Sequence, residues 1–253
     1  MVIIKTDNEI NHIKKSCLLT ANTLQFITEK IKPGIKTKYL DQIAESFILR
    51  YGGKPSFKGY GSEKNKFPAA ICTSVNDEIV HGIPGNRVLQ EGDIISIDIG
   101  TNLNGYYGDS ATTVGVGKIS KVAEKLIETT RKCLFAGIEK AINGNFIGDI
   151  SSAVQAVAEK NKFSVVREFV GHGVGLKVHE DPQIPNYGKP KTGLKLEKGM
   201  VLAIEPMVNQ GDYQTICSED GWTVRTEDGS LSAHFEHTIA IYEDRNEILT
   251  FLN

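Results

Sequence analysis

The chain has 253 residues, of which 40% are hydrophobic and 24% are charged, and its net charge at pH 7 is −2. These values are typical of a folded soluble protein, and they exclude both a disordered chain and a strongly basic nucleic-acid-binding surface. No apolar run reaches about 18 residues, so the sequence predicts neither a membrane span nor a signal peptide. The four scattered cysteines form no C-x-x-C pair, which favours free thiols and a cytoplasmic location.

Helical and strand-like patterns follow one another along the chain. A capping-box sequence at residues 6–9 opens a helical spacing of apolar residues that stops at Pro33-Gly34, and a second helix is expected from about Thr37 to Gly52-Gly53. A polar loop over 54–68 follows. The later predicted elements are strands at 70–74, 94–100 and 106–114, helices at about 121–141 and 149–159, and mainly strands from 165 to the end.

An internal repeat relates the two halves of the chain. Residues 89–99, LQEGDIISIDI, align with residues 196–206, LEKGMVLAIEP, at an offset of 107. Residues 32–35, before the second predicted helix, resemble residues 142–145, before the fourth, at an offset near 110. Each half also places a carboxylate at the same point of a strand. We therefore predict an α+β fold in which one domain, 1–253, consists of pseudo-symmetric halves of about 1–118 and 119–253.

Two aspartates lie on a predicted hairpin around the sequence Asn-Leu-Asn-Gly. If the turn centres between Leu103 and Asn104, Asp98 lies directly opposite Asp109. If Asn104-Gly105 is the turn instead, Asp98 opposes Ala111 and Asp109 is its diagonal neighbour on the same face. Two like charges so close are unfavourable unless a cation lies between them.

Three further chain positions extend this pair to a predicted metal site. The candidate ligands are Asp98, Asp109, His172, Glu205 and Glu236. The four carboxylates lie on or beside apolar strands, and the histidine is flanked by glycines. Four carboxylates around one dication would leave a large negative excess, so two bridged dications balance the charge better. Oxygen ligands with one imidazole and no thiolate suit Mn²⁺, Fe²⁺, Co²⁺ or Zn²⁺, which the sequence does not rank.

Each of these residues also has a purely structural interpretation. A single buried aspartate on a strand is more often a hydrogen-bonded structural residue, and a histidine between glycines is usually not a ligand. The joint pattern changes the balance, because three apolar strands that are each interrupted by a carboxylate are costly to explain by structure alone. The metal site is therefore the favoured interpretation.

Several motifs give the chain a resemblance to the type I methionine aminopeptidases over essentially its whole length, in the bacterial form without an N-terminal extension. The matching segments are 76–85, 96–113, 171–188, 202–207, 220–226 and 233–241. The resemblance implies the pita-bread α+β fold with internal pseudo-twofold symmetry. It also implies a catalytic domain that removes the initiator methionine from nascent proteins and peptides when the second residue is small.

The resemblance also implies a role for each ligand. Asp98 would bind one metal ion, Asp109 and Glu236 would bridge both, and His172 and Glu205 would complete the second. Glu205 would also act as a proton shuttle, because a carboxylate that touches the metal-bridging water can take its proton and pass it to the leaving amine. That water would attack the scissile carbonyl.

Two more histidines match catalytic positions of the family. His81, in the HGIP segment, would contact the amide nitrogen of the scissile bond, and His179 would donate a hydrogen bond to the substrate carbonyl or developing oxyanion. Without the motif match each would pass for an ordinary surface or core histidine. His234 and His237 flank Glu236 and are expected to be structural.

The substrate pocket is expected to be apolar, with room for one thioether side chain. The matching positions are Phe57, Tyr60, Phe67, Cys72 and Trp222. The sequence departs from the family pattern in two places. The loop 61–66 is longer than expected, and Val178 stands where the family leads us to expect an aromatic residue, so a wider pocket is a hypothesis.

Two other functions compete with this prediction. A proline-specific relative, an Xaa-Pro aminopeptidase or prolidase, would share the five ligands, but such enzymes usually carry a separate N-terminal domain. An inactive pita-bread protein that acts as a binding module would lose ligands, whereas all five are present here.

The expected partners are nascent polypeptide N-termini, met near the ribosome exit. We expect no direct nucleic-acid motif and no membrane contact, and a monomer is the default. A lysine-rich surface that could serve as a dock, although such surfaces are usually only solvated, comprises Lys54, Lys58, Lys64 and Lys66.

Overall fold

Four helices and seventeen strands make up the computed structural model of this chain, which describes residues 1–252. The helices are α1 (Asp7–Thr28), α2 (Thr37–Arg50), α3 (Lys121–Lys140) and α4 (Ile147–Lys160). The strands of the first half are β1 (Lys54–Pro55), β2 (Gly61–Ser62), β3 (Asn65–Lys66), β4 (Cys72–Val75), β5 (Glu78–Val80), β6 (Ile94–Leu103) and β7 (Tyr106–Gly115). Those of the second half are β8 (Ser164–Val165), β9 (Gly171–Gly173), β10 (Glu180–Ile184), β11 (Val201–Ile204), β12 (Met207–Asn209), β13 (Thr215–Cys217), β14 (Val224–Thr226), β15 (Ser232–His234), β16 (His237–Ile241) and β17 (Asn246–Ile248).

The first helix begins where the sequence predicts. The Thr6 hydroxyl accepts a hydrogen bond from the Glu9 amide at 3.3 Å, and the Glu9 carboxylate accepts one from the Thr6 amide at 2.7 Å. This reciprocal capping box satisfies two amides that the first turn leaves without partners. The other three predicted helices are also present, with bounds within about two residues of the expected ones.

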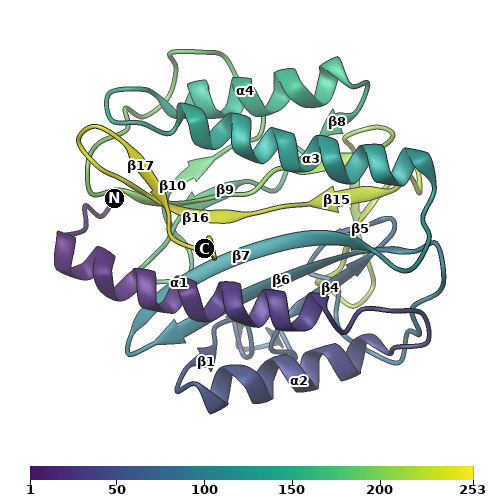
Figure 1. Cartoon of the computed structure of the whole chain (residues 1–253). Helices are drawn as coiled ribbons and strands as arrows, with labels where there is room; N and C mark the ends of the chain where they lie inside the picture. The colour runs from purple at the N-terminus through teal and green to yellow at the C-terminus, as the bar shows by residue number, and fades with distance from the viewer. Residues whose placement is uncertain (253) are drawn as a thin grey trace.

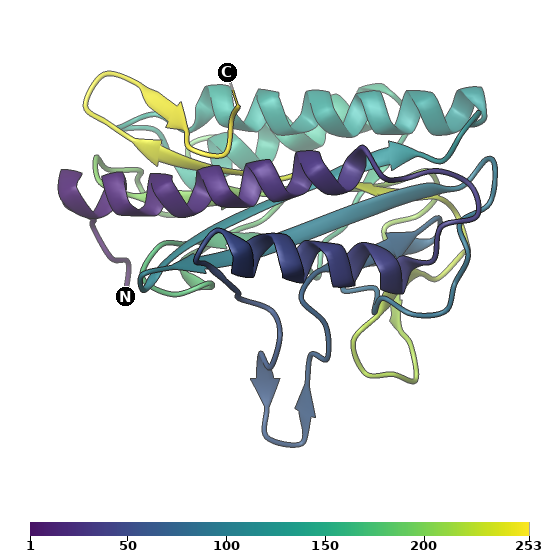
Figure 2. The same ribbon diagram turned by 60° about the horizontal axis from the view of Figure 1, so that its bottom comes forward.

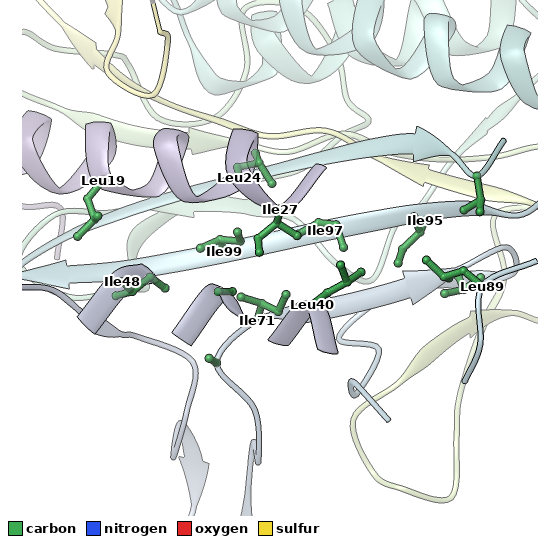
Figure 3. Packing of buried hydrophobic residues seen from close by; sticks show 14 residues of the cluster. Leu19, Leu24, Ile27, Leu40, Ile48, Ile71, Leu89, Ile95, Ile97 and Ile99 are labelled. Atoms are coloured by element: carbon green, nitrogen blue, oxygen red, sulfur yellow. The ribbon is translucent and has the colours of Figure 1, made fainter. Parts of the chain in front are cut away.

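The helices of each half pack on the strands of the same half (Figure 1). On β6, the side chains of Ile95, Ile97 and Ile99 are fully buried against α1 and α2, where they meet Leu40 and Ile48 (Figure 3). Burying each such side chain stabilises the fold by about 1.5–3 kcal/mol. Because side chains alternate along a strand, the intervening residues of β6 point to the opposite face, where the predicted site lies.

The second half repeats this packing with α3 and α4. Leu202 and Ile204 of β11 are buried with Ile239 and Ile241 of β16 and with Leu134 of α3. The strands β10, β9, β11, β16 and β17 form one antiparallel sheet in that order. Among residues 1–252, no helix has both the length and the hydropathy that crossing a membrane requires.

The repeat found in the sequence has a counterpart in backbone hydrogen bonds. In the first half the Gly34 amide donates to the Leu89 carbonyl at 2.8 Å. In the second half the Gly144 amide donates to the Leu196 carbonyl at 2.9 Å. In each half, therefore, a glycine just before the second helix is hydrogen-bonded to a leucine just before the strand that carries the carboxylate. The architecture is the α+β class that the sequence predicts.

The β6–β7 hairpin turns at Asn104-Gly105, so the second of the two registers considered from the sequence is correct. Asn104 and Gly105 have φ values of 56° and 88°, as a two-residue hairpin turn of the primed type requires. Asp98 pairs with Ala111, and Asp109 pairs with Gly100. The directly opposed register is wrong because its turn would force Leu103, which has a bulky side chain, into positive φ.

A hydrogen-bonded seam joins β7 of the first half to the chain around Glu236 in the second. Glu236 donates its amide to the Ala111 carbonyl at 2.9 Å. On one side of this bond, the Thr238 hydroxyl donates to the Asp109 carbonyl at 2.7 Å and accepts from the Asp109 amide at 3.2 Å. The amide and the carbonyl of Asp109 are therefore both satisfied by the Thr238 hydroxyl, where a neighbouring strand would otherwise supply backbone groups.

On the other side of the seam the arrangement is mirrored. The Thr113 hydroxyl donates to the His234 carbonyl at 2.8 Å and accepts from the His234 amide at 2.8 Å. Both threonines are buried, so their hydroxyls are the partners on which these buried backbone groups depend.

We predict that Thr238→Val destabilises the protein. The substitution keeps the shape of the side chain but leaves the two buried polar groups of Asp109 without partners, at about 1–3 kcal/mol for each group. Urea unfolding followed by circular dichroism measures the loss. The control is Thr28→Val, because Thr28 is half-exposed at the end of α1 and should change stability by less than about 0.5 kcal/mol. Equal effects of the two substitutions would contradict a specific role for the seam.

Candidate metal centre and substrate cavity

A cavity of about 300 Å³ lies where the two halves meet. All twelve residues predicted from the sequence line it: Phe57, Tyr60, Phe67, Cys72, His81, Asp98, Asp109, His172, His179, Glu205, Trp222 and Glu236. Val80, Glu168, Phe169 and Val170 line it as well, and the sequence did not single them out. The structure therefore brings the predicted ligands, the two histidines predicted to be catalytic and the predicted pocket residues to one place.

The five predicted ligands come from both halves. Asp98 lies on β6 and Asp109 on β7, whereas His172 lies on β9, Glu205 follows β11, and Glu236 lies between β15 and β16. Their ligand atoms form groups in which every atom lies within 4.8 Å of the others, namely Asp98 with Asp109 and Glu236, and His172 with Glu205 and Glu236.

Distances inside the second group are short. His172 Nε2 lies 3.3 Å from Glu205 Oε1 and 4.0 Å from Asp109 Oδ2. The other ring nitrogen, Nδ1, lies 2.9 Å from the Gly173 carbonyl oxygen. A carbonyl only accepts, so Nδ1 carries the proton and Nε2 presents its lone pair to the carboxylates. This arrangement is typical of a histidine prepared for a metal ion.

Burial strongly perturbs the carboxyl groups. It raises the pKa of Asp98 to about 7, with the neighbouring Glu205 adding to the effect. It also raises the pKa values of Asp109, Glu205 and Glu236 well above their usual range. Like charges reinforce the burial effect at Asp109, where Asp98 and Glu205 are the neighbours. Ionising all four carboxyl groups at the same time is therefore unfavourable.

Several atoms of this cluster have no hydrogen-bond partner among the described residues. They are Asp98 Oδ1, Asp109 Oδ1 and Glu236 Oε1, all buried. Meanwhile burial lowers the pKa of His172 to about 3, so its imidazole is neutral at neutral pH. These buried oxygen atoms accept no hydrogen bond within the described part of the chain and lie beside a neutral imidazole. Together they form a set of ligand atoms that fits divalent cations.

His81 and His179 border the cluster on the side of the apolar pocket. His81 follows β5 with a φ of 60°, and burial lowers its pKa to about 4. His179 Nδ1 lies 2.9 Å from the hydroxyl oxygen of Tyr60, and the His179 ring packs 4.4 Å from that of His172. Both histidines therefore have polar edges beside the place where a scissile bond would meet the ligands.

The pocket end of the cavity is apolar. Phe57, Phe67 and Cys72 are buried in one cluster, and Trp222 packs against it with its ring edge-on to Phe67 at 5.3 Å. Val178 is 7% exposed inside this cluster and does not line the cavity. It packs against residues that do line the cavity, so the widening of the pocket or its mouth by this small side chain stays a prediction.

His234, which the sequence predicts to be structural, lies beside the candidate ligand Glu205. Its Nε2 is buried, lies 3.6 Å from Glu205 Oε2 and has no hydrogen-bond partner among the described residues. The available signal was its spacing of two residues from Glu236, which puts both on the same side of an extended chain. His237 behaves as expected, since its Nδ1 meets the Thr250 hydroxyl at 2.8 Å.

Comparisons with known proteins identify the family of this chain. The sequence profile of the family described as Metallopeptidase family M24 matches residues 11–243. The "Methionine aminopeptidase" of Clostridium perfringens is 54% identical over 253 residues, covering 100% of each chain. "Methionine aminopeptidase 1" of Bacillus subtilis is 55% identical over 250 residues, covering 99% of each chain. The crystal structure of methionine aminopeptidase from Rickettsia prowazekii has a TM-score of 0.96 at 42% identity and covers 99% of this chain and 100% of that one.

A profile over most of the chain, supported by full-length relatives, defines the class of protein: this chain belongs to metallopeptidase family M24. Within that family it groups with the bacterial methionine aminopeptidases, so the resemblance inferred from the motifs is confirmed. The expected pita-bread α+β fold is confirmed by the same structural match.

The prolidases are more distant. The prolidase from Pyrococcus furiosus has a TM-score of 0.79 at 23% identity, covering 99% of this chain but 66% of that one. This likeness shows a shared fold alone. The proline-specific alternative therefore has much weaker support than the methionine enzymes.

We predict that the metal-free protein loses stability as the pH rises from about 6.5 to 8. Carboxyl groups of an unfolded chain are ionised throughout this window, whereas Asp98 in the folded protein has a pKa of about 7 and its three neighbours have raised pKa values. The folded state thus binds more protons, and the free energy of unfolding falls by about 1.4 kcal/mol for each proton and pH unit.

The window begins at 6.5 because the buried histidines, whose pKa values are lowered, act in the opposite direction below it. These residues are His81, His172, His179, His234 and His237. Urea midpoints of chelator-treated protein at pH 6.5, 7.25 and 8 test the trend, and saturating Mn²⁺ should restore stability at pH 8. A flat or rising trend without metal would refute it.

We predict that replacing His234 weakens metal binding. Replacing it by leucine removes the polar group that faces Glu205, and groups that orient metal ligands contribute about 10- to 100-fold to metal affinity. Calorimetric titration with Mn²⁺ should therefore show weaker binding by His234→Leu. The matched control is His237→Leu, in which Thr250 loses its partner but Glu205 does not. Unchanged affinity in His234→Leu would return this histidine to a purely structural role.

Proposed function

We propose that this protein is a dinuclear metal-dependent aminopeptidase that removes the N-terminal initiator methionine from nascent proteins and peptides when the second residue is small. The observation that carries the proposal is a single cavity with two chemically distinct ends. One end holds four buried carboxylates and a neutral imidazole, and the other is apolar. The full-length similarity to methionine aminopeptidases supports the choice of substrate.

The proposed cofactors are two divalent metal ions, drawn from Mn, Fe, Co or Zn. The two ligand groups share Glu236, which supports two ions bridged by a carboxylate rather than a single one. In this assignment Asp98 would hold one ion, Asp109 and Glu236 would be shared by both, and His172 and Glu205 would hold the other. When bound, such a pair supplies Lewis acidity, which activates water and polarises a carbonyl.

Glu205 is the proposed proton shuttle. Its carboxyl group is buried, which raises its pKa, and it lies between the Nε2 atoms of His172 and His234 at 3.3 and 3.6 Å. A carboxyl group with a raised pKa can take a proton at neutral pH and return it to a leaving amine. Its position on the cavity wall supports contact with both partners of that transfer.

The two histidines are proposed to orient the scissile bond. His179 would donate from Nε2 to the substrate carbonyl, because its Nδ1 meets the Tyr60 hydroxyl. His81 would contact the amide nitrogen of the same bond from the opposite wall. Because burial lowers the pKa of both histidines, each acts as a neutral hydrogen-bonding group.

The apolar end is proposed to hold the methionine side chain. Phe57, Tyr60, Phe67, Cys72 and Trp222 are the proposed contacts. A cavity of about 300 Å³ shared with the ligands leaves room for one unbranched side chain, and a thioether meets aromatic edges favourably. The walls therefore support selection of methionine over polar or much larger residues.

The proposed partners are nascent polypeptide N-termini near the ribosome exit, without direct nucleic-acid or membrane recognition, and the protein is proposed to act as a monomer in the cytoplasm. Two of the lysines in the suggested dock are already paired, Lys58 with Glu45 at 2.7 Å and Lys66 with Glu63 at 3.6 Å. This pairing weakens the lysine-rich surface as a ribosome contact. Cys17, Cys72, Cys133 and Cys217 are all free, which supports a reducing compartment.

We predict that Asp109→Ala abolishes most activity on a Met-Ala-Ser peptide. Residues that merely orient a ligand contribute about 10- to 100-fold, so a bridging ligand should cost at least about 100-fold in kcat/KM. Phe57→Ala and Trp222→Ala should each cost less. Methionine release is measured with Mn²⁺, Fe²⁺ or Co²⁺ added in turn.

The control is Asp93→Asn, because Asp93 caps a turn far from the ligands and should leave turnover intact. Near-wild-type turnover of Asp109→Ala would overturn the assignment of this residue. Wild-type protein that released no methionine with any of the three metals would overturn the proposed function. Release of Xaa from an Xaa-Pro peptide instead would favour the proline-specific alternative.

A further inference from the structure

The loop at 61–66 folds as a small hairpin. Its strands β2 and β3 pair antiparallel, with Gly61 opposite Lys66 and Ser62 opposite Asn65. Figure 2 shows this hairpin projecting from the body of the molecule, below the helices. At its base the Phe67 amide donates to the Tyr60 carbonyl at 2.7 Å. The residues on both sides of the hairpin, Tyr60 and Phe67, therefore belong to the cavity wall.

One side chain of this hairpin joins it to the opposite half of the chain. The indole Nε1–H of Trp222 donates to Asn65 Oδ1 at 2.7 Å. Asn65 Nδ2 in turn donates to the Gly221 carbonyl at 3.3 Å. The amide of Asn65 thus contacts both the ring and the backbone beside it, and it fixes the direction in which the indole points.

Two glycines allow the hairpin and the segment around Trp222 to approach each other closely. A β-carbon on Gly61 would come within 2.8 Å of Cζ2 of the Trp222 ring, so the hairpin backbone lies directly against the indole. A β-carbon on Gly221 would come within 2.9 Å of Asn65 Nδ2. Both glycines have positive φ, 113° and 73°, which other residues rarely adopt. The two segments therefore fit each other in shape as well as in hydrogen bonding.

Trp222 connects the hairpin to the cavity, because the same indole that is bonded to Asn65 lines the cavity wall. Its ring lines the apolar end, packs edge-on against Phe67 at 5.3 Å and faces the ring of His81 at 6.2 Å. On the other wall, Tyr60 at the start of the hairpin meets His179. The hairpin is therefore connected to the cavity at both ends.

We propose that Asn65 is a positioning residue that holds the indole of Trp222 as a wall of the pocket for the methionine side chain. The inference rests on the proposed function for the identity of that side chain. Asn65 does not line the cavity, so it acts only through Trp222. Because the indole meets the bound side chain and not the reacting atoms, loss of the contact weakens binding of substrate and transition state alike and raises KM more than it lowers kcat.

The chain offers a direct readout, because Trp222 is its only tryptophan. In Asn65→Ala the indole should become more accessible, so acrylamide should quench its fluorescence more strongly than in the wild type. Loss of hydrogen bonding of this kind corresponds to about 3- to 10-fold in affinity. We expect the KM for Met-Ala-Ser and the Kd for free methionine to rise by that factor, with kcat within about twofold.

Two control variants separate this role from a general effect on the hairpin. Lys64→Ala, at the exposed tip, should match the wild type in quenching, KM and Kd. Asn65→Asp keeps the acceptor for the indole but loses the donor to the Gly221 carbonyl, so its quenching and KM should lie between those of Asn65→Ala and the wild type. Unchanged quenching in Asn65→Ala, or an unchanged Kd for methionine, would overturn the proposal. A wild type that binds methionine but releases none from peptides would count against the proposed function alone, since quenching and Kd do not depend on turnover.

Discussion

The burial of four carboxylates in one cavity is the constraint on which the rest of the structure depends. In a surrounding of low polarity, neighbouring negative charges repel strongly, and each unpaired charge carries a large desolvation cost. The raised pKa values of Asp98, Asp109, Glu205 and Glu236 express this cost directly. Divalent cations remove it, so affinity for metal and stability of the fold are two consequences of the same cluster.

The internal repeat explains how a chain can place these groups so close together. Each half supplies a carboxylate from an equivalent strand, and the halves meet along a seam in which Thr113 and Thr238 take the place of strand partners. Side-chain hydroxyls can both donate and accept, so they satisfy the backbone without adding charge beside the ligands. Asp109 is held by this seam through its backbone alone, which leaves its carboxylate free to face the site.

The gathering of the candidate ligands and pocket residues at one cavity could be predicted from the sequence, because several apolar strands that are each interrupted by a carboxylate have few structural explanations and because the family motifs indicate the aromatic positions. The register of the hairpin was left open, since only the backbone geometry of Asn104 and Gly105 decides it. His234 was missed although its spacing from Glu236 pointed inward. The effect of Val178 on the pocket stays a prediction, because sequence position does not reveal how a side chain packs behind a cavity wall.

The two ends of the cavity follow different rules of construction. At the ligand end, Asp98 and Glu205 occupy equivalent points of the internal repeat. The pocket end is asymmetric: β5, which leads to His81, pairs with β14, just beyond Trp222. The hairpin reaches this end through Asn65 and Trp222, neither of which belongs to a group of candidate metal ligands. A substitution at Asn65 is therefore expected to alter the wall of the pocket without removing a candidate metal ligand.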